Sequence, residues 1–142
     1  METDPVNILY PLLALFALTA FCAFRLGYLR FTAVKRGEID PRFFKLYNGF
    51  EEPDQLRAYS RHLVNLFEAP ILFYVIVLIA FVAGYHGLLP LCLAWAYVAL
   101  RYAHSAVHLT SNDVLLRFRL FALSWLVLAV LWLVVFTAIT VA

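Results

Sequence analysis

Long apolar segments alternate with short polar ones along the whole chain. Four segments are long and mostly apolar, and residues 35–54 form the one long polar stretch between them. A helix needs about 20 apolar residues to cross the hydrocarbon core of a bilayer at 1.5 Å per residue. The pattern therefore predicts an all-α membrane protein, a four-helix transmembrane bundle with helices over residues 6–33, 55–84, 88–109 and 113–141. We expect these helices to form a single domain over residues 1–142.

Three local features add detail to this picture. Pro70 falls inside the second apolar segment, where its missing N–H predicts a kink or local distortion just before it. Residues 42–47 mix aromatic and basic side chains, which is typical of a short segment that lies on the headgroups. Residues 110–113 have the composition of a turn that ends in a helix N-cap.

Composition and charge support a membrane protein and indicate its orientation. The chain is 65% hydrophobic, whereas a soluble domain is about 45–50% apolar. All 11 lysines and arginines lie in or near the first-to-second and third-to-fourth connections. The positive-inside rule then places these connections in the cytoplasm and both termini on the non-cytoplasmic side. The start is acidic, with Glu2 and Asp4, and lacks the basic residues of a signal peptide, so we expect a retained first helix.

The cysteines and histidines show no recognised metal-binding or disulfide pattern. Cys22 and Cys92 both lie in apolar segments, where cysteine behaves as a small buried hydrophobe. His104 and His108 have an i, i+4 spacing that suits two ligands on one helical face, but no third ligand is evident from the sequence. We therefore predict that these histidines line a cavity or are satisfied by hydrogen bonds, and we predict no metal site.

Polar residues inside the apolar segments fall on narrow helical faces. On the second predicted helix Arg61, Asn65 and Glu68 share an arc of about 80° with Arg57. A charge at membrane depth costs roughly 2.5–3.5 kcal/mol and by default marks a functional site. We expect such stripes to face protein or a wet cavity rather than lipid. The stripes on the other helices comprise Arg25 and Thr32, then Tyr97, Arg101, His104, Ser105 and His108, and finally Arg117 and Ser124.

The residues alone leave two interpretations of these stripes open. In the first, ion pairs and hydrogen bonds hold the helices together, with Glu68 paired to an arginine. In the second, the stripes line a cavity for a polar, anionic ligand. Arg25, Arg61, Arg101 and Arg117 lie on the stripes, against Glu68 as the one intramembrane acid. The second interpretation is favoured, because arginines that lack a counter-charge repel one another unless an anion joins them.

The second predicted helix carries a motif that resembles a known family. Arg61-x-x-x-Asn65-x-x-Glu68-x-Pro70, in a chain of four helices, resembles the MAPEG superfamily, the membrane-associated proteins in eicosanoid and glutathione metabolism. The resemblance covers essentially the whole chain. It implies a homotrimer with active sites between neighbouring subunits, and glutathione bound in a bent shape as a co-substrate on the cytoplasmic side.

The resemblance also implies roles for individual residues. On the third predicted helix, Arg101-x-x-His104 is similar to a segment of the prostaglandin E synthase branch. For stabilising the glutathione thiolate, Arg117 is the first candidate, followed by Arg30 and then Arg25. An arginine suits this role because it lowers the pKa of an adjacent thiol. The residues implied to bind glutathione are Arg61, Asn65, Glu68, Arg101, Tyr102, Arg25 and His104.

Two departures separate the chain from the well-studied animal members. Pro70 comes two residues after Glu68, where those members have it three or four residues after. Their tyrosine late on the third helix is replaced by His108 or Ala106, depending on how the segments are matched. The chain therefore looks like a bacterial branch, and we do not expect leukotriene or prostaglandin synthesis.

The expected protein is an integral, multi-pass protein of the bacterial inner membrane that binds glutathione. If it is active, it adds the thiolate to a hydrophobic electrophile as a transferase, or it reduces a lipid hydroperoxide as a peroxidase. Its expected partners are two further copies of the chain, the lipid bilayer and a hydrophobic small molecule, and no nucleic acid. The alternative is a non-catalytic membrane protein whose basic stripes bind anionic lipid or stabilise a trimer.

Overall fold

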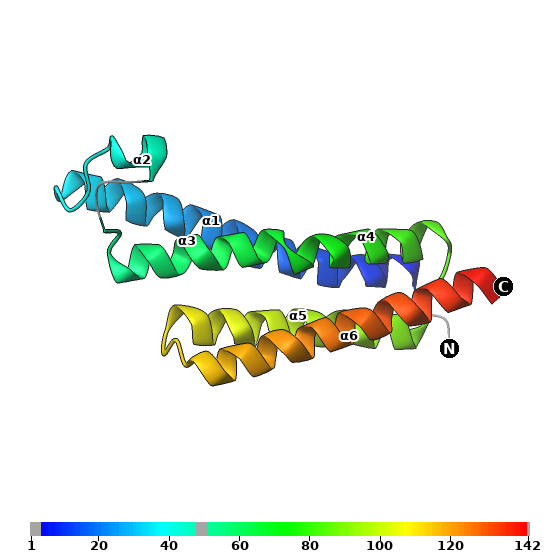
Figure 1. Cartoon of the computed structure of the whole chain (residues 1–142). Coiled ribbons are helices and arrows are strands. Elements are labelled where there is room, and N and C mark those ends of the chain that lie inside the picture. The colour runs from blue at the N-terminus through cyan, green and yellow to red at the C-terminus, as the bar shows by residue number, and fades with distance from the viewer. Residues whose placement is uncertain (1–3, 48–50, 142) are drawn as a thin grey trace.

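The computed structural model describes residues 4–47 and 51–141, which are helical almost throughout (Figure 1). A short 3-10 helix, η1 (Pro5–Ile8), leads into α1 (Leu9–Lys35), and the one-turn α2 (Phe43–Leu46) lies in the connection that follows. The remaining helices are α3 (Asp54–Phe67), α4 (Ala69–Val82), α5 (Leu88–Leu109) and α6 (Val114–Val141). Their outer bounds lie within three residues of the predicted ones, and the second predicted helix is divided into α3 and α4.

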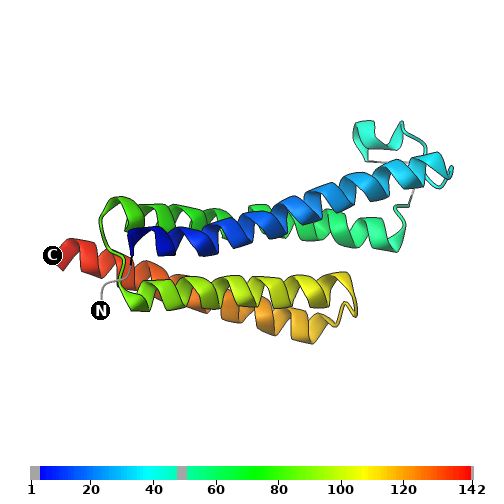
Figure 2. The ribbon, with the colours of Figure 1, turned by 180° about the vertical axis from the view of Figure 1, so that it is seen from behind.

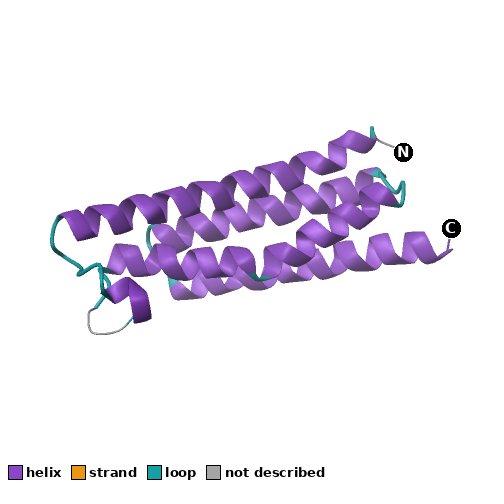
Figure 3. Ribbon diagram, turned by 90° about the horizontal axis from the view of Figure 1, so that it is seen from above, coloured by secondary structure: helices purple, strands orange, loops and turns teal. Residues whose placement is uncertain are grey.

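The helices form two antiparallel pairs that pack side by side. In one pair α1 lies against α3 and α4, and in the other α5 and α6 form a hairpin (Figures 1 and 2). The start of η1, the end of α6 and the α4–α5 connection lie at one end of the bundle (Figures 1 and 3). The α1–α3 connection with α2, and the α5–α6 turn, lie at the opposite end. The basic connections are therefore grouped at one end.

Several of the helices are suited to a membrane. The segments Pro5–Lys35, Asp54–Val82 and Val114–Val141 are long and apolar enough to span one. The 22-residue α5 has the length of a span, but Arg101, His104 and His108 lower the mean hydropathy of its second half. Because α5 packs against α6 as a hairpin (Figure 1), we treat it as part of the membrane bundle, and its status as the fourth span remains a prediction.

Apolar side chains fill the space between the two pairs and also cover the outside. Leu15 of α1 and Phe73 of α4 are fully buried, and Phe73 stacks on Tyr97 of α5 with ring centroids 4.6 Å apart. On the outward faces Phe24 is 80% and Phe136 is 63% exposed. A surface this apolar is typical of helices that face lipid, because the bilayer core offers no water to solvate polar groups.

Glu68 divides the second predicted helix into α3 and α4. Its φ and ψ of −93° and −94° lie outside the helical region, and Pro70 lies in the first turn of α4. The distortion expected just before Pro70 is thereby confirmed. Because helix ends leave carbonyls without partners, and Pro70 has no N–H to offer, the end of α3 needs an outside donor. Arg101 of α5 supplies one, since its Nη2 donates to the carbonyl of Asn65 at 2.9 Å.

A tight turn joins α5 to α6 at the basic end of the bundle. Asn112 has a φ of 50°, in the left-handed region that asparagine adopts more readily than most residues. The Oδ1 atom of Asp113 accepts a hydrogen bond from the N–H of Leu116 at 2.8 Å, which confirms the N-cap predicted in residues 110–113. This cap fixes the start of α6, whose first turn carries Arg117.

Candidate functional site

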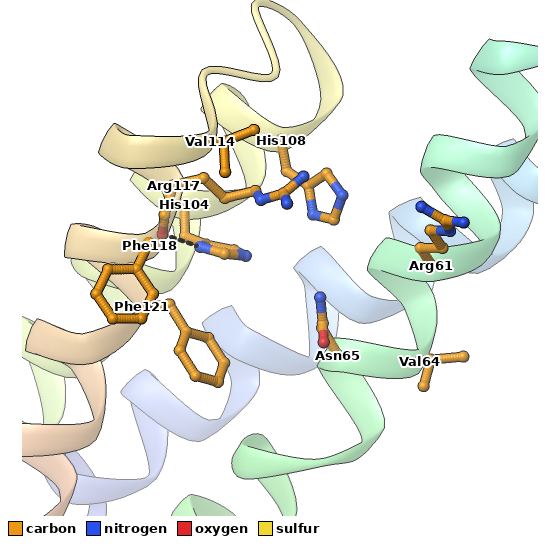
Figure 4. A pocket seen from close by; sticks show the side chains of 9 residues that line it. All are labelled: Arg61, Val64, Asn65, His104, His108, Val114, Arg117, Phe118 and Phe121. Carbon is orange, nitrogen blue, oxygen red and sulfur yellow. Dashed lines mark hydrogen bonds between the residues drawn. The ribbon is translucent and has the colours of Figure 1, made fainter.

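A cavity of about 520 Å³ opens between α3, α5 and α6 near the basic end of the bundle (Figure 4). On each helix the lining residues recur three or four positions apart, with Val64 next to Asn65 and Phe118 next to Arg117, so that they form one broad face. One part of the lining is polar or basic, and the other part is aliphatic or aromatic. The lining residues are Arg61, Val64 and Asn65 of α3, His104 and His108 of α5, and Val114, Arg117, Phe118 and Phe121 of α6.

The polar part of the cavity carries positive charge. Arg61 and Arg117 both line it, and none of its nine lining residues is acidic. Arg117 is anchored to the α5–α6 turn, because its Nη1 donates to Oδ1 of Asn112 at 2.6 Å. The side chain of Asn65 extends from α3 toward His108 and Arg117 (Figure 4). Two guanidinium groups and an amide around one space form a site suited to an anion.

Arg101 lies behind the cavity and is absent from its lining. Its side chain is fully buried, and its Cζ atom is 5.9 Å from the ring centroid of Phe121. Besides the Nη2 bond to the Asn65 carbonyl, its Nε and Nη1 have no hydrogen-bond partner among the described residues. A buried guanidinium with unpartnered donors raises the free energy of the folded state, and a nearby anion reduces that cost.

Three imidazoles meet beside the cavity, and sequence reasoning found only two of them. His104 and His108 of α5 line the cavity, while His62 of α3 packs behind them, fully buried. Nδ1 of His62 lies 3.2 Å from Nδ1 of His108. Nδ1 of His104 donates to the carbonyl of Arg117 at 3.1 Å, since a carbonyl can only accept (Figure 4).

His62 was missed because it lies off the polar stripe of its helix. It directly follows Arg61, and so projects about 100° away from it around the helix. On that face its neighbours one turn away, Tyr59 and Leu66, are buried. The sequence signal for His62 is a single histidine on an otherwise apolar helical face. The partners of that histidine depend on which helix packs against this face.

The remaining predicted residues lie outside the cavity. Glu68 and Arg30 share a separate hollow of about 390 Å³ between α1 and α3. The hydroxyl of Tyr102 donates to the carbonyl of Ala14 at 2.8 Å. Arg25 lies over the ring of a tyrosine in its own helix, with 5.3 Å between its Cζ and the ring centroid. These four residues therefore do not meet the cavity within one chain.

The structure brings four of the predicted site residues together. Arg61 and Asn65 stand on the α3 wall, with His104 and Arg117 across from them on the α5–α6 hairpin, and Arg101 supports the α3 wall from behind. The roles of these side chains toward a ligand remain predictions. The arrangement itself can hold an anion next to an apolar surface.

Comparison with known proteins identifies the family. A family model described as the MAPEG family matches residues 8–137. The comparisons with curated proteins and with solved structures give no match. The matched range contains α1 to α5, most of α6 and every residue that lines the cavity. The chain therefore belongs to the MAPEG family, a family of membrane enzymes related to glutathione.

Proposed function

We propose that the cavity between α3, α5 and α6 binds glutathione, or a similar anionic thiol, as a co-substrate. One observation carries the proposal: in a member of the MAPEG family, Arg61 and Arg117 line a cavity that has no acidic lining residue. The volume of about 520 Å³ also suits a small ligand, because binding pockets measure roughly 300–1,000 Å³.

The chemistry of glutathione fits the polar part of the lining. The tripeptide carries two carboxylates, one ammonium and one thiol. Arg61 can bind a carboxylate with charge-assisted hydrogen bonds, and Asn65 can bond the peptide backbone. We assign Arg117 to the thiol, because Asn112 fixes its guanidinium beside the apolar lining. A thiol has a pKa near 8.5, and an adjacent cation lowers that pKa and increases the fraction of nucleophilic thiolate.

The apolar part of the lining suits a hydrophobic second substrate. Phe118 and Phe121 of α6 continue the cavity from Arg117 along the helix toward the membrane interior. In a transferase reaction the thiolate sulfur forms a bond to an electrophilic carbon, and a leaving group departs or a proton is taken up. In a peroxidase reaction two glutathione molecules reduce one lipid hydroperoxide to an alcohol and water, and they are oxidised to the disulfide.

A homotrimer would give partners to the polar residues that face outward. Arg61 and Glu68 are exposed in the single chain. A charge at membrane depth needs a partner, and a neighbouring subunit's helix is the partner that we propose. In the proposed trimer, Arg30, Arg25 and Tyr102 also lie at this interface. We place the protein in the bacterial inner membrane with its basic end in the cytoplasm.

Titration of purified protein with glutathione tests the proposal. The protein is prepared in detergent or lipid nanodiscs and measured by calorimetry, together with ultraviolet absorbance for thiolate formation. We expect saturable binding and a thiolate signal for the wild type. Arg61→Gln and Arg117→Gln should each weaken binding about 10- to 100-fold, because each removes a charge-assisted hydrogen bond of roughly 1.5–3 kcal/mol.

Arg119→Gln is the matched control for these substitutions. Arg119 is exposed, lies two residues after Arg117 on α6 and does not line the cavity. It should therefore bind glutathione like the wild type. Wild-type protein that shows neither heat nor a thiolate signal would contradict the proposal and support the non-catalytic, lipid-binding alternative.

A further inference from the structure

We propose that His62, His104 and His108 form a binding site for a divalent transition-metal ion of the zinc type. One ring nitrogen of each histidine lies within 4.8 Å of the others. Zinc–nitrogen bonds of about 2.0–2.1 Å in a tetrahedral site place ligand nitrogens about 3.3 Å apart. The Nδ1 atoms of His62 and His108 are 3.2 Å apart, so this pair already has the required separation.

The fold holds the three imidazoles from two directions. His104 and His108 stand one turn apart on α5, and His62 approaches from α3, which packs against α5. All three side chains are buried. The ring of His108 is nearly perpendicular to the other two, at 82° to His62 and 81° to His104. The widest nitrogen separation exceeds a tetrahedral edge by about 1.5 Å at most, a distance that rotation of an imidazole can close.

His104 already has the orientation of a metal-binding histidine. Its Nδ1 donates to the Arg117 carbonyl, so its Nε2 carries the lone pair. That Nε2 is buried and has no hydrogen-bond partner among the described residues. A metal-binding histidine commonly binds the ion through one ring nitrogen, while the other ring nitrogen donates to a backbone carbonyl that fixes the ring. A hydrogen bond between His62 and His108 accounts for their contact, but it leaves this lone pair of His104 unused.

The chemistry of the cluster defines the ion. Three neutral imidazoles suit zinc and its neighbours in the first transition series, whereas magnesium and calcium prefer oxygen ligands. Because His104 and His108 line the cavity, the fourth position of the ion would open into it. Arg61 and Arg117 line the same cavity. These arginines oppose a bare dication, so they favour an ion whose fourth ligand is an anion, such as hydroxide or a thiolate.

This site goes beyond the proposed binding of glutathione. The sequence led us to predict no metal site, because no third ligand was evident beside His104 and His108, and His62 of α3 offers that ligand. Metal binding is measured without any thiol, and glutathione binding can be measured in protein that has been treated with a chelator. Failure of one proposal therefore leaves the other standing.

Cobalt(II) titration of the full-length protein tests the site. The protein carries an affinity tag without histidine, is freed of metal with a chelator and is kept in detergent. Visible absorption reports the geometry, because tetrahedral cobalt absorbs far more strongly than the octahedral aqueous ion. We expect one tetrahedral cobalt per chain, displaced by zinc. His62→Gln and His108→Gln should each weaken cobalt binding at least about tenfold, because each removes a ligand.

His86→Gln is the matched control, because His86 lies at the other end of the bundle, in the α4–α5 connection. It should bind cobalt like the wild type. X-ray absorption of zinc on the wild-type protein provides a measurement that does not depend on the folding of variants. Three imidazole nitrogens at about 2.0–2.1 Å would support the site. A shell of oxygens alone, absent binding, or equal binding by His62→Gln would overturn it.

Discussion

The polar stripes of α3 and α5 look alike on a helical wheel, but they occupy opposite environments in the fold. Every member of the α5 stripe is at most 5% exposed in the single chain. On α3, Arg61 and Glu68 are exposed and Asn65 is half-buried. The members of the α5 stripe are Tyr97, Arg101, His104, Ser105 and His108.

The difference lies in where each stripe finds its partners. Arg101 and His104 of α5 donate to main-chain carbonyls of α3 and α6, so part of this stripe is satisfied within one chain. The side chains of Arg61 and Glu68 make no hydrogen bond or ion pair with another described residue. We infer that the α5 stripe supports the fold through Arg101 and also lines the cavity through His104 and His108, whereas the exposed α3 residues Arg61 and Glu68 serve a ligand or a neighbouring subunit. Three substitutions test this contrast.

Arg101→Ala should have the largest effect, and the effect should be on stability. The substitution leaves a void in the bundle and removes the donor that satisfies the Asn65 carbonyl at the end of α3. We expect the free energy of unfolding to fall by roughly 2–5 kcal/mol, because the lost packing and the unsatisfied carbonyl outweigh the relief of removing two unpartnered guanidinium donors. Unfolding by dodecyl sulfate titration, followed by circular dichroism, measures this change. Arg119→Ala, at an exposed position, should stay within about 0.5 kcal/mol of wild type. Equal stability of the two variants would contradict a structural role for Arg101.

Glu68→Gln should have an intermediate effect, and the effect should be on ligand binding. Within one chain the carboxylate is exposed at the break between α3 and α4 and lines a hollow separate from the cavity. Only in the proposed trimer would it reach glutathione, where it can accept from the ammonium or a backbone N–H. We expect glutathione affinity to fall about tenfold, because a hydrogen bond to a charged group is worth roughly 1.5–3 kcal/mol. Calorimetry measures the affinity, and analytical ultracentrifugation follows the proposed trimer. Glu38→Gln, in the α1–α2 connection, is the control. A trimer that dissociates instead would assign Glu68 to assembly.

Asn65→Ala should have the smallest effect. The substitution separates the two roles of this residue, because it removes the side-chain amide and keeps the main-chain carbonyl. The main-chain carbonyl that accepts from Arg101 remains, so stability should stay within about 0.5 kcal/mol of wild type. The amide that extends into the cavity is lost. Glutathione affinity should fall by about 2- to 12-fold, which corresponds to a neutral hydrogen bond of roughly 0.5–1.5 kcal/mol. Loss of stability at constant affinity would place Asn65 with the α5 stripe.

The helices and the break in the second one were accessible from the sequence. A run of about 20 apolar residues crosses a bilayer most favourably as a helix, so the hydropathy pattern alone locates the helices. Pro70 predicts its own distortion, because a missing N–H acts locally. The N-cap at Asp113 was predictable for the same reason, because a capping side chain bonds an N–H only three residues further along the chain.

The composition of the cavity was accessible only in part. Helical spacing grouped Arg61 with Asn65 and His104 with His108, and both pairs line the cavity. It also grouped Glu68 with Arg61, although the break at Glu68 and the packing of α1 place that carboxylate in a different hollow.

The sequence by itself determined which residues lie in apolar helices and which share a helical face, because both follow from local periodicity. Only the tertiary structure decided which faces meet, because that depends on how the helices pack across the bundle. It placed Arg101 behind the cavity as a donor to α3, and it brought His62 to His104 and His108. A residue's own helix could not reveal either contact, since each partner comes from a segment more than 30 residues away in the chain.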